Sequence, residues 1–326
     1  MLLGKRNTLA ALCGALSLAL LGAACPALAQ DGWPAKPIRM VVPFAPGGSN
    51  DVIARRLALQ LSKNLGQSVV VDNRAGGGST IGANVVATAP ADGYTLLFVS
   101  GSLATTAAVQ KTPYDPVKAF DPVSRVAIAP FVILTREGFP ARTVQELIAY
   151  AKANPGKINY GSAGLGDSTQ LATELFNNAA GIKMTAVGYK GISPAQMDLI
   201  AGRIDLVITT VASIRGTAAE SLPKIAFTTV KRDADFPNVP TVRESGLDYV
   251  VDVWWGVFAP AGTPAPVRDR LNHEIAAIVA EPEFASFLKT AGAVPAPSTP
   301  QQLRDEVAKD VARWTDTARR AGIQQQ

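Results

Sequence analysis

Short apolar runs alternate with helix-patterned segments along almost the whole chain, and this alternation constrains the fold more than any other feature. The apolar runs end in turn residues, and the segments after them place apolar residues three or four positions apart. The first such segment, for example, puts Ile53, Leu57 and Leu61 on one helical face. Parallel strands need a crossover between them, usually a helix. The pattern therefore predicts an α/β protein with parallel sheets.

The expected elements fall into two successive blocks. The first block is predicted to contain strands at 38–42, 68–72 and 94–99 and helices around 53–65 and 81–89. The second is predicted to contain helices at 143–153, 168–180 and 194–201 and strands at 158–161, 185–189, 204–209 and 225–229. Longer extended segments are expected at 126–134 and 250–258, and three helical pieces follow from 264.

The two long extended segments indicate how the blocks are connected. The helices after Pro264 have no strands of their own to cover, so they are expected to pack on the first block. The chain would then cross twice between two lobes, forming a hinge of two crossing strands. We expect lobe 1 to comprise 30–128 and 255–326 and lobe 2 to comprise 129–254. A cleft between two lobes is a common place for a ligand.

The N-terminal segment has the order of a secretory signal peptide. Lys5 and Arg6 precede an apolar stretch, and Ala27-Leu28-Ala29 forms a small-residue cleavage site. We expect residues 1–29 to be removed after Ala29, which places the protein in the periplasm. An alternative is a lipoprotein anchored through Cys25. It is disfavoured because Gly22 stands where a lipid-attachment motif has Leu.

Cleavage would also remove Cys13 and Cys25, the only two cysteines of the chain. The mature protein would then have no disulfide and no cysteine metal site. His273 is the single histidine and lies beside an apolar helical stripe, so an exposed helix residue is expected rather than a general base. We expect no catalytic residues, no metal site and no cofactor.

Three further observations exclude other classes of protein. The formal net charge of +5 is mild and the chain has no Lys/Arg run, so nucleic acid is not an expected partner. The glycines of NRAGGGSTIGA match neither nucleotide-binding pattern, and a packed turn before a helix is expected there. Ser162 in Gly-Ser-Ala-Gly does not match the nucleophile motif of serine hydrolases.

Two glycine-bearing connections between a strand and a helix carry the functional signal. One is Pro-Phe-Ala-Pro-Gly-Gly at 43–48, and the other is Gly-Ser-Ala-Gly-Leu-Gly at 161–166. A helix N-terminus collects partial positive charge and exposes N–H groups, so it favours an anion. Ordinary strand-to-helix turns are the alternative for each loop taken singly. One such loop in each lobe predicts a cleft that holds one small anion from both sides.

Several segments resemble the Bug-type solute receptors, the periplasmic binding components of tripartite tricarboxylate transporters. They are PIRMVVPFAPGGSNDVIAR, VVVDNRAGGGSTIGANVVATAPADGYTLLF, INYGSAGLGDSTQLATELF, VGYKGISPAQMDLIAGRIDLVI and WGVFAPAGTP. The resemblance covers nearly the whole mature chain in order. It implies a two-lobed periplasmic binding fold of the type II, Venus-flytrap kind, in which backbone amides and hydroxyls hold a ligand carboxylate.

Carried over by position, the resemblance implies a set of ligand-binding residues. They are Phe44, Gly47, Gly48, Asp51, Ser100, Gly101, Ser102, Ser162, Ala163, Gly164, Asp167, Ser168, Tyr189 and Lys190. Two positions depart from the family pattern. Gln170 replaces a common His, which removes a titratable charge, and Gly188 replaces a common Pro, which loosens the loop presenting Tyr189.

The leading hypothesis is therefore a receptor for a small organic acid, amino acid or aromatic acid. It would deliver this carboxylate to the permease subunits of a tripartite tricarboxylate-type transporter, acting as a monomer. One alternative is a module that presents its ligand to a sensor ectodomain. Another is a hydrolase or isomerase that uses the same cleft, which prolonged incubation with the acid would reveal. Phe44 alone does not identify the acid.

Overall fold

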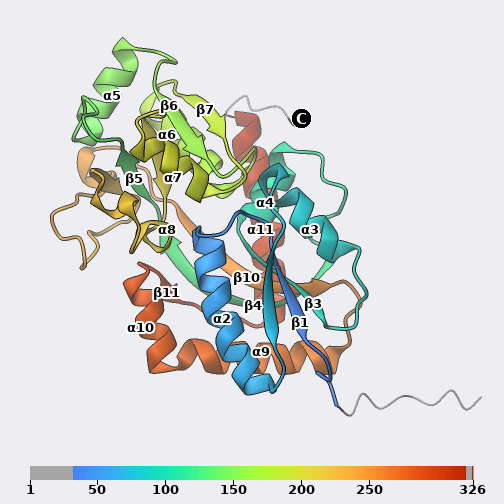
Figure 1. The fold of residues 1–326 in the computed structure, drawn as a ribbon. Coiled ribbons are helices and arrows are strands. Elements are labelled where there is room, and N and C mark those ends of the chain that lie inside the picture. The colour runs from blue at the N-terminus through green and yellow to red at the C-terminus, as the bar shows by residue number, and fades with distance from the viewer. Residues whose placement is uncertain (1–31, 321–324, 326) are drawn as a thin grey trace, which may run out of the picture. The chain divides into compact units, whose positions relative to one another are not determined.

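The fold is built on two β-sheets with helices packed against them (Figure 1). A computed structural model describes residues 32–320 and residue 325. The expected signal peptide, 1–29, lies outside the described residues. The elements below belong to the unit formed by 36–326.

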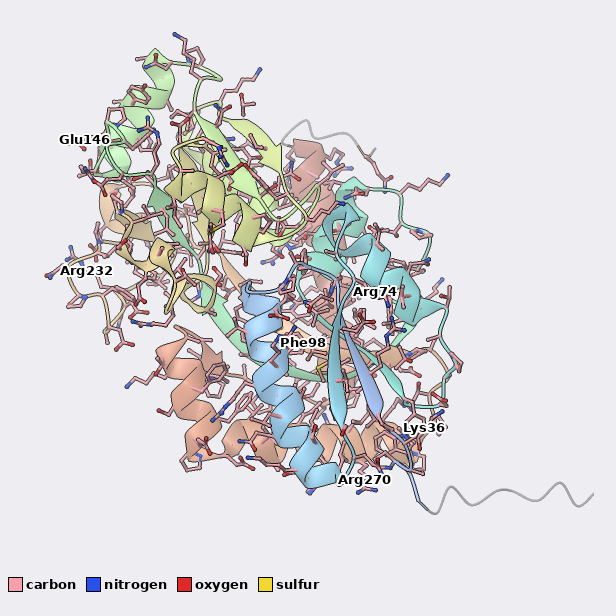
Figure 2. The ribbon with its side chains drawn as sticks, in the orientation of Figure 1. Lys36, Arg74, Phe98, Glu146, Arg232 and Arg270 are labelled. Atoms are coloured by element: carbon pink, nitrogen blue, oxygen red, sulfur yellow. The ribbon has the colours of Figure 1, made fainter. Side chains whose placement is uncertain are left out.

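The first sheet has the strand order β11-β4-β10-β3-β1-β2. β1 pairs in parallel with β2 and with β3, whereas β10 lies antiparallel between β3 and β4. The strands are β1 (Ile38–Val42), β2 (Val69–Asn73), β3 (Thr95–Ser100), β4 (Phe120–Pro130), β10 (Asp252–Pro260) and β11 (Val294–Pro295). Figure 2 shows Phe98 of β3 inside this region, where its side chain is fully buried.

The second sheet has the strand order β7-β6-β8-β5-β9. β6 is parallel to β7 and to β8, and β5 is antiparallel to β8 and to β9. The strands are β5 (Val132–Thr135), β6 (Asn159–Ser162), β7 (Thr185–Gly188), β8 (Leu206–Thr209) and β9 (Lys224–Phe227).

Both sheets are mixed, so the expectation of parallel sheets is wrong for part of each. The antiparallel members include β5 and β10, which follow the two passages of the chain between the sheets. A helical crossover forces consecutive strands to be parallel. A strand that arrives from the other sheet is not bound by that rule, and both of these strands run antiparallel to their neighbours.

The helices match the predicted periodicity with two exceptions, α4 and the four-residue α8, which were not predicted. Nearly all residues of α4 are buried, so α4 has no polar face and no helical period in its sequence. The helices are α2 (Ser49–Leu65), α3 (Thr80–Ala87), α4 (Ser102–Val109), α5 (Val144–Ala153), α6 (Ser168–Ala180), α7 (Ile192–Ile200), α8 (Val211–Ile214), α9 (Ala265–Ala280), α10 (Pro282–Thr290) and α11 (Pro300–Arg320). Within the described ranges, no helix is long and apolar enough to cross a membrane.

The C-terminal helices pack on the first sheet, which confirms that expectation. α9 and α11 both contact β4, and α9 also contacts α2. α11 additionally contributes Trp314 and Ala318 to a buried cluster that includes Leu171 of α6. α11 therefore contacts both the first sheet and α6, the helix that follows β6 of the second sheet.

Candidate ligand-binding site

The helix α2 begins with unused backbone donors. Gly48 is its N-cap and provides no side chain to cap it, and Gly47 adopts a φ of +88° that favours glycine. The first-turn N–H groups of Ser49, Asn50 and Asp51 have no acceptor among the residues the structure describes. An uncapped N-terminus offers these donors, together with the positive end of the helix dipole, to an anion.

The Asp51 side chain holds this loop in place through hydrogen bonds and an ion pair. Its carboxylate accepts from the Gly47 N–H at 3.0 Å and from Asn73 Nδ2 at 2.9 Å, and it pairs with Arg55 at 2.9 Å. Burial opposes its ionisation, but the hydrogen bonds from Arg55, Gly47 and Asn73 outweigh burial and lower the pKa of Asp51. Asn73 also donates to the carbonyl of Phe44 at 3.0 Å. The carboxylate thus shapes the loop, and Asp51 is not among the residues that line the cavity described below.

The helix α6 differs from α2, because the N–H groups of its first turn already donate hydrogen bonds within the protein. Asp167 is the N-cap and accepts from the N–H groups of Thr169 and Gln170, each at 3.1 Å. It also accepts from the Ala163 N–H at 3.2 Å. Burial raises the pKa of Asp167 despite these hydrogen bonds. The Ser168 N–H donates to Ser102 Oγ at 3.2 Å, so this helix start keeps no free donor in its first turn.

The segments around the two helix starts touch one another directly. Ser102 Oγ lies 3.0 Å from Ser168 Oγ and 2.9 Å from Ser100 Oγ. The Ala45 N–H donates to the Lys190 carbonyl at 2.9 Å. Gln110 donates to the carbonyl of Leu165. These bonds join loops of the first sheet to loops of the second, so the cleft between them is closed.

A cavity of about 30 Å³ remains between these loops. That volume holds a water molecule or two, so an organic acid enters only when the loops separate. The lining residues come from the segments at the N-termini of α2, α6 and α7, from β3 and β10, from the first passage between the sheets and from the end of β8. They are Phe44, Gly48, Ser49, Asn50, Ser100, Phe131, Ala163, Asp167, Ser168, Thr169, Ile192, Thr209, Thr210, Val253 and Trp255.

The structure brings some of the predicted residues to this cavity and places others around it. Those lining it are Phe44, Gly48, Ser100, Ala163, Asp167 and Ser168. Those outside the lining are Gly47, Asp51, Gly101, Ser102, Ser162, Gly164, Tyr189 and Lys190. Most of the second group hold the loops in place: Ser102, for example, bonds to Ser168, and Gly164 has a φ of +140° at a close backbone contact with Gly78.

Tyr189 and Lys190 lie at the edge of the closed cleft. The Tyr189 hydroxyl donates to Asp198 at 2.7 Å, and burial and this bond raise the pKa of Tyr189 to about 12. Lys190 is exposed and contributes its carbonyl. Of the two departures from the family pattern, Gln170 accepts from the Gly166 N–H at 2.5 Å and so supports the second glycine loop. Gly188 is exposed in β7.

Sequence reasoning missed the lining residues that come from the hinge and from β8. Phe131 and Trp255 belong to the predicted crossings, so the crossings themselves were the available signal. Thr209 and Thr210 follow a predicted strand without any glycine motif. None of the lining residues is Lys, Arg or His, so the positive end of a helix dipole is the main positive charge facing the cavity. The described residues contain no cluster of three or more His, Cys, Asp or Glu suited to a metal ion.

Comparison with known proteins gives a consistent result. Residues 53–323 match the model of the family described as "Tripartite tricarboxylate transporter family receptor". A UPF0065 protein from the tcbD–tcbE intergenic region of Pseudomonas sp. (strain P51) is 39% identical over 316 residues, covering 96% of this chain and 93% of the relative. Protein BugT of Bordetella pertussis is 37% identical over 310 residues, covering 94% and 95%.

Solved structures agree with the sequence relatives. The periplasmic binding protein BugD superposes with a TM-score of 0.86 at 35% identity, covering 90% of this chain and all of BugD. The structure of R. palustris Rpa4515 with adipate has a TM-score of 0.86 at 36% sequence identity, and the match covers 89% of this chain and 99% of Rpa4515. The structure of MatC from Rhodopseudomonas palustris with bound malate has a TM-score of 0.82 at 31% sequence identity, and the match covers 87% of this chain and 99% of MatC. The fold is thus that of two-lobed periplasmic binding proteins, and the chain belongs to the tripartite tricarboxylate transporter receptor family, whose members bind solutes rather than transform them.

Proposed function

We propose that this protein binds a small carboxylate between its two lobes and delivers it to the membrane subunits of a tripartite tricarboxylate-type transporter. The observation that carries the proposal is the uncapped N-terminus of α2, whose Ser49, Asn50 and Asp51 N–H groups have no acceptor among the described residues. Free amides at a helix N-terminus suit a carboxylate. Rpa4515 and MatC, whose solved structures contain adipate and malate, support this ligand class.

Three finer statements belong to the same proposal. The chain is exported and cleaved after Ala29, because residues 1–29 have the order of a signal peptide. Lobe 1 comprises 30–128 and 255–326 and lobe 2 comprises 129–254, a division supported by the strands that build each sheet. The receptor acts as a monomer, which light scattering of the mature protein tests.

Calorimetry of the purified mature protein with mono- and dicarboxylates, including adipate and malate, tests the ligand class. Saturable binding of a carboxylate is expected, and a lack of binding across the set would contradict the proposal. Mass spectrometry of the acid after long incubation should return it unchanged. Uptake of the labelled acid by cells that lack the gene, compared with complemented cells, tests delivery, and equal uptake would contradict that part.

A further inference from the structure

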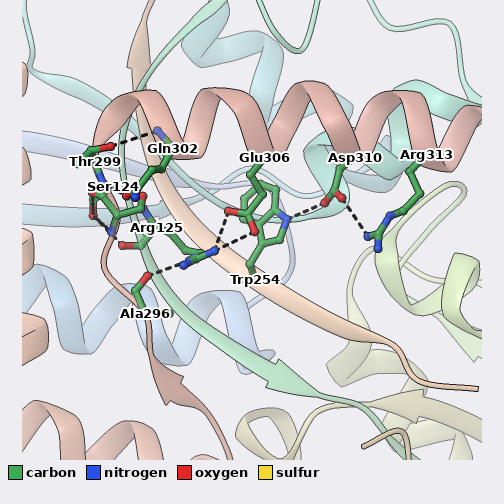
Figure 3. Close-up of polar contacts among 10 residues, drawn as sticks. Ser124, Arg125, Trp254, Ala296, Thr299, Gln302, Glu306, Asp310 and Arg313 are labelled. Atoms are coloured by element: carbon green, nitrogen blue, oxygen red, sulfur yellow. Dashed lines mark hydrogen bonds and ion pairs between the residues drawn. The ribbon is translucent and has the colours of Figure 1, made fainter. Parts of the chain in front are cut away.

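Two adjacent tryptophans on β10 differ in whether their indole N–H is used. Successive side chains of a strand point to opposite faces, so Trp254 and Trp255 face different surroundings. The Trp254 N–H donates to Asp310 of α11 at 2.8 Å, as Figure 3 shows. The Trp255 side chain is fully buried and lines the cavity, yet its N–H has no partner within the described structure.

The two threonines at the end of β8 show the same contrast. The Thr209 hydroxyl is 2.7 Å from Ser213 Oγ. The Thr210 hydroxyl, on a residue only 3% exposed, has no partner among the described groups. Both threonines line the cavity. In each of the two pairs, a residue whose polar group has a hydrogen-bond partner is therefore next to one whose polar group has none.

Unsatisfied buried donors are unfavourable, and most buried polar groups in proteins have partners. An indole N–H donates and cannot accept, whereas a hydroxyl does both. A group that satisfies both Trp255 and Thr210 must accept a hydrogen bond, as an oxygen atom of a water does in the closed cavity or an oxygen atom of a ligand does when it replaces that water. Both residues lie on elements other than α2, which supplies the free amides for the carboxylate.

We infer that the ligand carries a second acceptor oxygen besides its carboxylate, and that the Trp255 N–H and the Thr210 hydroxyl bind this oxygen. The inference rests on the proposed carboxylate-binding function and adds the specificity of the same cavity. The second oxygen belongs either to a neutral group, such as a hydroxyl, or to a second carboxylate. The cavity lining has no Lys, Arg or His, so either group is recognised by hydrogen bonds rather than by a full positive charge.

The β10 strand also explains how Trp255 faces the cavity. Its register against β4 shifts between Trp255 and Gly256. Such an irregularity turns side chains away from the regular direction of the strand. Because β10 directly follows the second passage between the sheets, a hydrogen bond to Trp255 would connect the ligand to the strand next to the hinge.

Calorimetry with three acids of equal chain length tests the inference: adipate, 6-hydroxyhexanoate and hexanoate, with the matching series from four to eight carbons. The first two carry a second acceptor and hexanoate does not. The wild type is expected to prefer an acid with a second acceptor. Trp255→Phe and Thr210→Val should each reduce that preference by about fivefold. Adipate and the hydroxy acid together distinguish a charged from a neutral acceptor.

A matched variant controls for the loss of an indole. Trp254→Phe removes an N–H that is bonded to Asp310, on a residue outside the cavity lining. It should leave the preference within about twofold of the wild type. Thermal unfolding of each unliganded variant reports any loss of fold separately.

Three outcomes would overturn the inference while leaving the proposed function intact. The wild type would show no preference for a second acceptor, or neither Trp255→Phe nor Thr210→Val would change it. Alternatively, the two variants would weaken hexanoate as strongly as adipate, which would mean that these donors bind the carboxylate itself. Failure of the wild type to bind any acid in the series would instead contradict the proposed function, and the inference with it.

Discussion

The N-termini of α2 and α6 follow similar glycine-bearing loops but use their backbone donors in opposite ways. At α2 the acidic residue, Asp51, turns back to Gly47 and Asn73, and the first-turn N–H groups have no acceptor in the described part of the chain. At α6 the acidic residue, Asp167, is the N-cap and binds the Thr169 and Gln170 N–H groups. The acidic residue is the N-cap at α6 but the third residue of the helix at α2, and this difference of three positions accompanies the different use of the backbone donors.

The comparison implies that the two loops do not hold the carboxylate equally. We expect the α2 loop to provide hydrogen-bond donors to the carboxylate and the α6 loop to close over the ligand. Ser102 and Ser168 add hydroxyls, but in the closed cleft these bond to each other. The largest effects on affinity are therefore expected from changes to the backbone of α2.

Replacing Ser49 with proline should produce the largest effect. Proline is tolerated at the first position of a helix, and Gly48 has the extended conformation that a residue before proline prefers. Ser49→Pro thus removes one free N–H and leaves the helix intact. Hydrogen bonds to charged groups contribute about 1.5–3 kcal/mol, so carboxylate affinity should fall by roughly 10- to 150-fold relative to Ser49→Ala.

The matched variant at the other helix is Ser168→Pro, measured against Ser168→Ala. Asp167 is also extended, and the Ser168 N–H already donates to Ser102 within the protein. The loss of affinity should therefore be several-fold smaller than at Ser49. Calorimetry of all four variants gives both ratios. Equal losses at the two helices would show that both starts bind the anion through their backbones.

Replacing Gly164 and Gly48 with alanine should separate the role of the α6 loop in closure from the role of the α2 loop in donating hydrogen bonds. A Cβ at Gly164 would lie 3.0 Å from the Gly78 nitrogen and 3.2 Å from the Tyr189 carbonyl oxygen, at a φ of +140°. A Cβ at Gly48 would meet only the end of the Ile192 side chain, at 3.1 Å. Gly164→Ala should weaken binding by about tenfold, or about 1.4 kcal/mol, and Gly48→Ala by less than about threefold.

Affinity and the ligand-induced change in radius of gyration measure this difference. Gly164→Ala should bind with a smaller decrease in radius, because the added Cβ hinders closure. The melting temperature without ligand controls for strain in the loop. A greater loss of affinity in Gly48→Ala than in Gly164→Ala would mean that Gly164 does not limit closure.

The two aspartates should affect stability with opposite dependence on pH, which is the smallest of the expected effects. The pKa of Asp51 is lowered, so its stabilising contribution is present above about 3.8 and is lost as the pH falls through the folded-state pKa. The pKa of Asp167 is raised, so the wild type loses stability as the pH rises from about 3.8 through the folded-state pKa.

Urea unfolding of the wild type, Asp51→Asn and Asp167→Asn between pH 3 and 7 tests these signs. The stability advantage of the wild type over Asp51→Asn should grow by about 1 kcal/mol as the pH rises. Its stability relative to Asp167→Asn should decline over the same range. The same sign of slope for both aspartates would contradict the opposite environments described for them.

Much of the fold could be predicted from the sequence, because the spacing of apolar residues and the residues of turns are local signals. The helix α6 is an example: a helix was predicted at 168–180, and α6 occupies the same residues. The hydrogen bond from the Gly166 N–H to the Gln170 side chain, in contrast, depends on the loop conformation, which the spacing of residues does not report.

Features that depend on distant segments could not be predicted. Asp51 leaves the α2 donors free because Asn73, from another strand, holds its carboxylate. The helix α4 was missed because it is buried all round. The unsatisfied Trp255 N–H can be recognised only once the strand register and the neighbouring Trp254–Asp310 bond are known.

The position of β10 has a consequence for how the chain folds. β10 lies between β3 and β4, although 121 residues, 131–251, separate it from the end of β4. Until residues 252–260 have been synthesised, β3 and β4 each lack a neighbour and expose an edge. Contacts between residues so far apart in sequence slow folding, because a long loop must close before they form. The first sheet therefore stays incomplete during most of synthesis, and in a chain ending before residue 252 β3 is paired only with β1 and β4 lacks both of its partners.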